Sequence, residues 1–154
     1  RIGLDREMFR GRHDHTIDKK GRLSIPAGFR VELQERSQKA PMLTISRNHL
    51  ELYPREDYDA IERDLAAKSD LQPNVQAYRR VFIGLATECP IDGQGRILVP
   101  PSLREHAQLE NAVTVVGNLQ KIEVWQTEAF DREMTTTLAR LEEIQRSVDK
   151  GSDD

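Results

Sequence analysis

Asp18-Lys19-Lys20-Gly21-Arg22-Leu23-Ser24-Ile25-Pro26 occurs a second time in this chain, 74 residues later, as Asp92-Gly93-Gln94-Gly95-Arg96-Ile97-Leu98-Val99-Pro100. The correspondence continues beyond each proline, where it pairs Phe29-Arg30 with Leu103-Arg104, Glu51-Leu52-Tyr53 with Glu123-Val124-Trp125, and Tyr58-Asp59 with Phe130-Asp131. The last two pairs are 72 residues apart, so one loop of the second copy is two residues shorter. A match that keeps its order over about forty positions indicates an internal repeat.

Each copy of the motif predicts a tight turn followed by a strand and a helix. Asp accepts bonds from backbone N–H groups two or more residues on, and Gly tolerates positive φ. The branched apolar residues that follow favour a short strand, and the proline favours the first turn of a helix. Each turn would then present one arginine, Arg22 or Arg96, at the tip of a hairpin. The alternative is that both motifs are only good turn sequences in a duplicated β-fold.

Apolar periodicity predicts the remaining elements. Strands are expected at 15–17, 23–25, 42–46, 50–53, 87–91, 96–99, 112–116 and 121–125, and helices at 26–35, 58–68 and 101–107. A further helix should bury Val75, Tyr78, Phe82 and Leu85 and leave Arg79 and Arg80 solvated. Asp57 is expected to cap the 58–68 helix and Thr127 the last one, whose narrow apolar stripe runs from Phe130 to Val148.

These elements divide the chain into four parts. The first repeat is expected at 12–59, a helical connector at 60–85, the second repeat at 86–129, and a C-terminal helix and tail at 130–154. Residues 1–7 precede Met8-Phe9-Arg10-Gly11 and hold no apolar anchor, so they are expected to be dispensable, and residues 151–154 are expected to be disordered. No apolar run is long enough to span a membrane, and no signal peptide is evident. The single cysteine, Cys89, is expected to be a small buried residue in a reducing cytoplasm.

The formal net charge of −3 is distributed unevenly. Residues 10–47 hold nine Lys and Arg against four Asp and Glu, a balance of +5, whereas residues 48–72 and 118–154 each balance at −4. The first repeat therefore carries a basic surface on an otherwise acidic protein. Affinity for phosphate depends on such local arrangement rather than on net charge.

The doubled Asp-x-x-Gly-Arg-(Leu/Ile)-x-(Ile/Val)-Pro, the opening Met8-Phe9-Arg10-Gly11 and the repeated Glu-(Leu/Val)-(Tyr/Trp) together resemble the MraZ family. These are bacterial transcriptional regulators, linked to the division and cell-wall gene cluster, with two SpoVT/AbrB-type repeats. The resemblance implies an α+β, mainly β fold, a duplicated AbrB-like swapped-hairpin barrel with flanking helices. It also implies a ring-shaped homo-oligomer, located in the cytoplasm and on the nucleoid, that binds repeated boxes on double-stranded DNA upstream of its own operon.

Carried over to this chain, the DNA-binding residues of the family fall on Arg22 and Arg96, with the basic residues Lys19 and Lys20 beside the first of them. Gln94 stands where the second copy would need a lysine, which predicts unequal roles for the two repeats. An arginine offers a planar fork for guanine O6 and N7 or for phosphate. Arg30 and Arg104, near the helix ends, are expected to be structural.

Two other classes of function are alternatives to DNA-binding regulation. AbrB-type folds also serve as protein-binding modules, such as antitoxin-like partners or assembly scaffolds, although the basic first repeat favours DNA. An enzyme is disfavoured because no nucleophile–base or paired-carboxylate spacing is present. His13 and His15 share a strand face, but no Cys or acidic partner follows at metal-ligand spacing. The sequence therefore predicts no metal, no cofactor, no membrane contact and no small-molecule substrate.

Overall fold

The computed structural model describes residues 8–151, so the expectations for residues 1–7 and 152–154 lie outside it. The strands are β1 (Phe9–Thr16), β2 (Arg22–Ser24), β3 (Met42–Ile45), β4 (Leu50–Tyr53), β5 (Thr87–Glu88), β6 (Arg96–Leu98), β7 (Ala112–Leu119) and β8 (Lys121–Gln126). The helices are α1 (Ala27–Arg36), α2 (Arg55–Ala66), α3 (Pro73–Phe82), α4 (Pro101–Ala107), α5 (Thr127–Ala139) and α6 (Leu141–Gly151). The predicted α+β class is confirmed.

The sheets interleave the two repeats. One antiparallel sheet has the order β1-β7-β8-β4-β3-β5, and a second pairs β2 with β6. The corresponding strands of the two repeats are β1 and β5, β3 and β7, and β4 and β8. Exchanging each strand for its counterpart gives the same six-stranded order in reverse. The first strand of each repeat thus pairs with the hairpin of the other, and β4–β8 and β2–β6 lie on the pseudo-two-fold axis. Neither repeat can complete its sheet alone.

The core is built from matching positions of the two copies, all of them buried. The pairs are Leu23 with Ile97, Ile25 with Val99, Phe29 with Leu103, Leu33 with Ala107, Leu43 with Val115, Leu50 with Ile122 and Leu52 with Val124. Cys89 joins this core as predicted, and burial raises the pKa of its thiol to about 12. β5 ends at Glu88, earlier than expected, just before Cys89 and Pro90, a residue with no N–H to donate.

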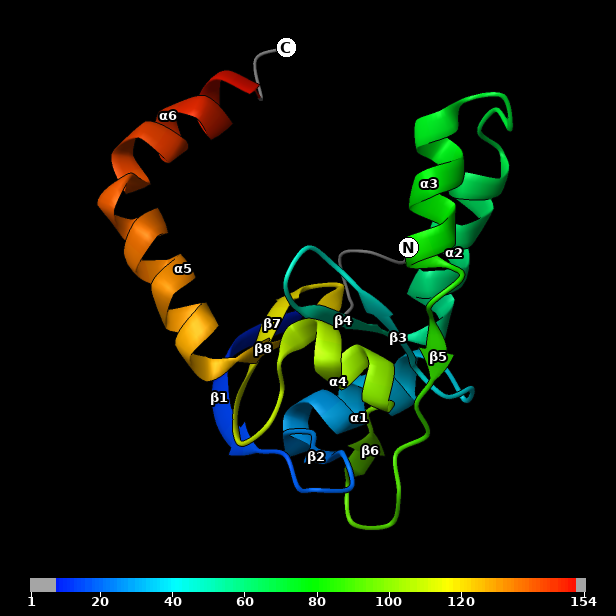
Figure 1. Ribbon diagram of the computed structural model, residues 1–154, viewed down its shortest axis with the longest axis vertical. Coiled ribbons are helices and arrows are strands. Elements are labelled where there is room, and N and C mark those ends of the chain that lie inside the picture. Colours follow the sequence, from blue (N-terminus) through cyan, green and yellow to red (C-terminus); the bar gives the residue numbers. More distant parts are fainter. Residues whose placement is uncertain (1–7, 152–154) are drawn as a thin grey trace.

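Two helical arms project from the barrel (Figure 1). α2 and α3 lie side by side along one edge, while α5 and α6 extend from the opposite edge. Within residues 8–151, no helix is both long enough and apolar enough to cross a bilayer. α2 begins at Arg55, and Asp57 does not cap it. The Asp57 carboxylate instead accepts from Arg36 at 3.3 Å.

The predicted buried stripe of α3 is mostly wrong. Phe82 is buried and contacts the Tyr53 and Tyr58 rings. Tyr78 stacks on Phe82 but is 52% exposed, and Leu85 is 48% exposed. The reason is that only the C-terminal end of α3 reaches the sheet. Arg79, expected in solvent, donates from Nε to the Leu65 carbonyl at 3.1 Å and binds the open C-terminal end of α2.

The C-terminal helix is also divided, contrary to expectation. α5 ends at Ala139, and Arg140 interrupts the helical backbone before α6 begins. The N-cap is Gln126, whose side chain accepts from the Ala129 N–H at 2.9 Å, and not Thr127. Phe130 packs edge-on against Trp125, so this end of α5 is tied to the barrel. Beyond it, Leu138, Leu141 and Val148 stay 48–65% exposed.

Candidate nucleic-acid interface

The first motif forms a closed turn around Asp18. Its Oδ1 accepts from the backbone N–H groups of Lys20 at 3.0 Å and Arg22 at 2.9 Å, and its carbonyl accepts from Gly21 at 3.0 Å. Gly21 has φ +90°, a conformation that side chains rarely adopt. The predicted Asp-x-x-Gly turn is therefore present, and it fixes the backbone from which Arg22 extends.

The second motif repeats this geometry. Oδ1 of Asp92 accepts from the Gln94 N–H at 2.8 Å and the Arg96 N–H at 3.0 Å, and Gly95 has φ +78°. These hydrogen bonds favour the charged form of the carboxylates. The backbone N–H of Arg22 and, after it, the Arg22 side chain lower the pKa of Asp18 to about 2, although desolvation opposes them. The corresponding bonds also lower the pKa of Asp92.

Both arginines lie on the outer face of the β2–β6 ribbon. Leu23 pairs with Ile97 and both point into the core, so their neighbours Arg22 and Arg96 share the opposite face. The side chain of each arginine is held by the aspartate of its own turn. Nε of Arg22 donates to Asp18 Oδ2 at 2.7 Å, and Nε of Arg96 to Asp92 Oδ2 at 3.3 Å.

The Asp–Arg contact leaves the far end of each guanidinium available. It uses only Nε, and within residues 8–151 the two terminal nitrogens of Arg22 and of Arg96 have no hydrogen-bond partner. The Arg22 side chain is 38% exposed and that of Arg96 26%. Each aspartate thus holds its arginine through Nε and leaves the two terminal nitrogens of a partly exposed side chain available as donors.

Arg30 and Arg104 brace the turns from the opposite repeats. Nε of Arg30 donates to the Ile25 carbonyl at 3.0 Å, and Nε of Arg104 to the Val99 carbonyl at 3.1 Å. A Cβ added to Gly95 would lie 2.5 Å from Arg30, and one added to Gly21 would lie 2.7 Å from Arg104. This reciprocal packing agrees with the structural role expected for both arginines.

Comparison with known proteins identifies a family for this chain. The model of the family described as "MraZ protein, putative antitoxin-like" matches the chain twice, at residues 8–81 and 82–148.

The chain belongs to the MraZ family.

Its relatives include proteins named "Transcriptional regulator MraZ" from three bacteria. The chain is 40% identical to that of Haemophilus influenzae (strain PittEE) over 148 residues, which is 95% of both chains. It is 40% identical to that of Actinobacillus pleuropneumoniae serotype 5b over 86% of this chain and 88% of the relative, and 39% identical to that of Thermoanaerobacter sp. over 92% and 97%.

The two repeats of this MraZ-family chain are not equally charged at the turn. Lys19 and Lys20 are exposed beside Arg22, whereas the uncharged Gly93 and Gln94 flank the second turn. Sequence reasoning missed Leu98, which lies opposite Arg22 on the outer face and is 59% exposed. The strand pattern held a signal for it, because Leu98 follows the core residue Ile97 on a strand whose side chains alternate in direction.

Proposed function

We propose that this chain is a DNA-binding transcriptional regulator that reads short repeated boxes upstream of its own division and cell-wall operon, in the cytoplasm and on the nucleoid. The names of its relatives support transcriptional regulation. The observation that carries DNA binding is the pair of oriented, half-exposed arginines on one face of the β2–β6 ribbon.

The chemistry of this face suits duplex DNA. The outer nitrogens of Arg22 and Arg96 form two-donor forks that match guanine O6 and N7 in the major groove. Lys19 and Lys20 supply charge for phosphate, and Leu98 offers an apolar contact of the kind that thymine methyl groups make. A two-stranded ribbon is also narrow enough to enter the major groove.

The direct test is a gel shift with DNA from upstream of the gene, repeated over a series of salt concentrations and with a scrambled duplex. We expect tighter binding to the native duplex and a steep loss of affinity as salt rises, because lysine–phosphate contacts release counterions. Equal affinity for both duplexes would contradict sequence-specific binding, and salt-independent or absent binding would contradict a DNA interface.

Asp18→Asn tests whether the carboxylate orients Arg22. The amide oxygen can still accept the two backbone N–H bonds, so the turn should form, but the ion pair to Arg22 Nε is lost. We expect near-native thermal stability with weaker specific DNA binding, measured on one preparation. Native affinity in Asp18→Asn would show that the contact with Asp18 does not position Arg22.

We also propose that the chain assembles into a ring-shaped oligomer larger than a dimer. The exposed apolar stripe of Leu138, Leu141 and Val148 on α5 and α6 supports a contact between copies. Light scattering at micromolar concentration should give a mass well above twice 17.7 kDa. Leu138→Glu should lower that mass, whereas Thr136→Glu, an exposed change on the same helix, should not. A monomer in the native protein would refute the proposal.

A further inference from the structure

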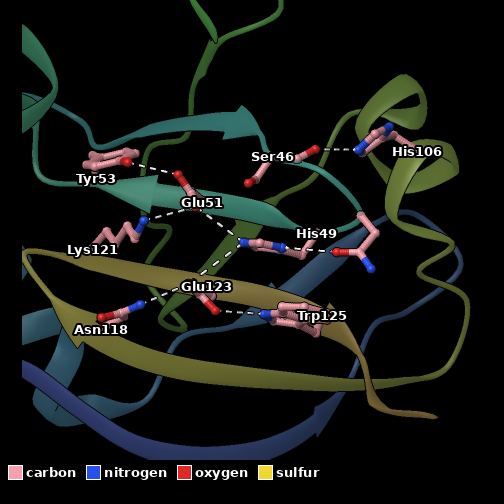
Figure 2. A network of polar contacts seen from close by, with 10 residues as sticks. Ser46, His49, Glu51, Tyr53, His106, Asn118, Lys121, Glu123 and Trp125 are labelled. Carbon is pink, nitrogen blue, oxygen red and sulfur yellow. Dashed lines mark hydrogen bonds and ion pairs between the residues drawn. The ribbon is translucent and has the colours of Figure 1, made fainter. Parts of the chain in front are cut away.

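A buried polar cluster lies on the pseudo-two-fold axis, where β4 pairs with β8 (Figure 2). Each repeat contributes the same pattern of a basic residue, a glutamate and an aromatic residue at alternate positions. The first copy is His49-x-Glu51-x-Tyr53 and the second is Lys121-x-Glu123-x-Trp125. The cluster is separate from the β2–β6 ribbon that carries Arg22 and Arg96.

The two glutamates are direct partners across the β4–β8 pair. Their side chains are only 9% and 14% exposed. Like charges opposite each other on neighbouring strands destabilise a sheet, and burial makes the repulsion stronger. The Lys121 ammonium, 3.1 Å from Glu51 Oε2, relieves part of this repulsion, and a cation between the two carboxylates would relieve more of it.

The outer carboxylate oxygens are already held by the two aromatic residues. The Tyr53 hydroxyl donates to Glu51 Oε1 at 2.8 Å, and the Trp125 indole N–H donates to Glu123 Oε1 at 2.9 Å. These bonds turn both Oε2 atoms toward His49. Nε2 of His49 lies 3.2 Å from Glu51 Oε2 and 3.8 Å from Glu123 Oε2.

Both ring nitrogens of His49 lie next to oxygen atoms. Nδ1 is 3.4 Å from the Asn48 side-chain oxygen, and with its proton on Nδ1 the ring offers Nε2 as an acceptor. The ring is also stacked on Trp125 with centroids 4.3 Å apart. Three acceptor atoms then converge on one point, which either a second imidazole proton or a metal ion would fill.

We propose that His49 Nε2, Glu51 Oε2 and Glu123 Oε2 form a site for a divalent transition-metal ion of the zinc class, shared by the two repeats. Within residues 8–151 this is the one group of three potential ligands whose donor atoms all lie within 4.8 Å of one another. Two ligands about 2.1 Å from a tetrahedral zinc ion are about 3.4 Å apart. The observed distances of 3.2 and 3.8 Å bracket that value.

The surrounding groups complete such a site. Tyr53, Trp125 and Asn118 act as outer partners of the carboxylates, and Asn118 donates to Glu123 Oε2 at 3.0 Å. Lys121 Nζ lies 3.1 Å from Glu51 Oε2 and competes with the ion for that oxygen. Its side chain is 26% exposed and can withdraw to solvent, which leaves water as the fourth ligand. A bound ion would tie the β3–β4 hairpin of the first repeat to β8 of the second.

Calorimetric titration of the full chain with Zn²⁺ tests the site, with Co²⁺ absorption reporting the ligand geometry. Trp125 is the only tryptophan and stacks on His49, so its fluorescence should change in the same titration. We expect one ion per chain. His49→Gln and Glu123→Gln should each weaken binding by more than the roughly 10–100-fold that loss of an outer partner costs. Lys121→Met should tighten binding, because the competing ammonium is gone.

His106→Gln is the matched control, because His106 is exposed and bonds the Ser46 carbonyl outside the cluster. It should bind Zn²⁺ like the native chain. Absence of saturable binding in the native chain would overturn the proposal and leave an Nε2–H of His49 as the bridge between the two carboxylates. Binding that survives Glu123→Gln, or that Lys121→Met does not strengthen, would also overturn it. The Lys121 variant keeps the test decisive if His49→Gln fails to fold.

Discussion

Arg22→Ala is expected to abolish sequence-specific DNA binding and to leave the fold and the assembly unchanged. The side chain lies on the outer face of β2, and its terminal nitrogens have no partner within residues 8–151. A two-donor contact to guanine contributes roughly 1–3 kcal/mol of discrimination. If several copies bind several boxes at once, the loss is multiplied. Gel shifts with native and scrambled duplexes measure it.

Two related variants should behave differently. Arg96→Ala should weaken binding in the same direction but less, because Gln94 leaves its turn without the lysine that accompanies Arg22. Lys20→Ala should lower affinity for all sequences alike and flatten the salt dependence, since a phosphate contact carries no sequence information. We therefore expect the loss of specificity to be largest for Arg22→Ala, smaller for Arg96→Ala and smallest for Lys20→Ala.

Thermal unfolding on the same preparations provides the control. The Asp18–Arg22 contact is half exposed, and exposed ion pairs add little to stability. Native affinity in Arg22→Ala would defeat the DNA-contact role. A large drop in melting temperature together with lost affinity would assign Arg22 a structural role through Asp18 instead.

The sequence predicted the symmetry of the fold because the duplicated motif sets both the turns and the core. Leu23 and Ile97 were expected on corresponding strands, and the structure pairs them directly across β2 and β6. The turn signals were equally informative, since Asp and Gly act through bonds within five residues. Helix α4 was also predicted with its observed bounds, because Pro100 and Pro101 mark its start.

The predictions that failed concern positions where contacts between residues distant in the sequence decide the structure. Periodicity in α3 indicates an apolar face but not whether anything covers it. The arm that contains α3 projects from the sheet, and Tyr78 on this helix is 52% exposed. Arg79 was expected in solvent because it lies off the apolar stripe, but its acceptor, the Leu65 carbonyl near the end of α2, comes from a different helix and is not signalled by the local sequence. The break at Arg140 has no Gly or Pro to signal it.

The polar cluster on the pseudo-two-fold axis could not be predicted from the sequence for the same reason. His49 and Glu123 are distant in the chain and meet only because β4 and β8 pair across the two repeats. The candidate ligand pair at short spacing is His13 and His15, and neither residue belongs to the group of three. The one available signal was the basic-x-Glu-x-aromatic pattern at matching positions of both copies.

Gly21→Ala is expected to produce the largest loss of stability among the turn glycines. The added Cβ would lie 2.6 Å from the backbone oxygen of Val99, at a residue with φ +90°. A left-handed conformation costs a residue with a Cβ roughly 1–2 kcal/mol, and overpacking typically adds about 1–3 kcal/mol. The Val99 backbone cannot yield easily, because its N–H donates to the Gly21 carbonyl at 2.8 Å. The variant should unfold at a clearly lower temperature and lose DNA binding with the turn.

The other glycines of the motifs give a graded control. Gly95→Ala meets the Arg30 side chain, which can move, so it should cost less than Gly21→Ala even though φ is +78°. In Gly93→Ala the added Cβ meets no atom within 4 Å. Alanine restricts the unfolded chain more than glycine does, so the stability of this variant should be unchanged or slightly raised. Melting temperatures at one fixed chain concentration rank the three. If Gly93→Ala destabilises as much as Gly21→Ala, the close approach of Gly21 to Val99 is not what holds the turns together.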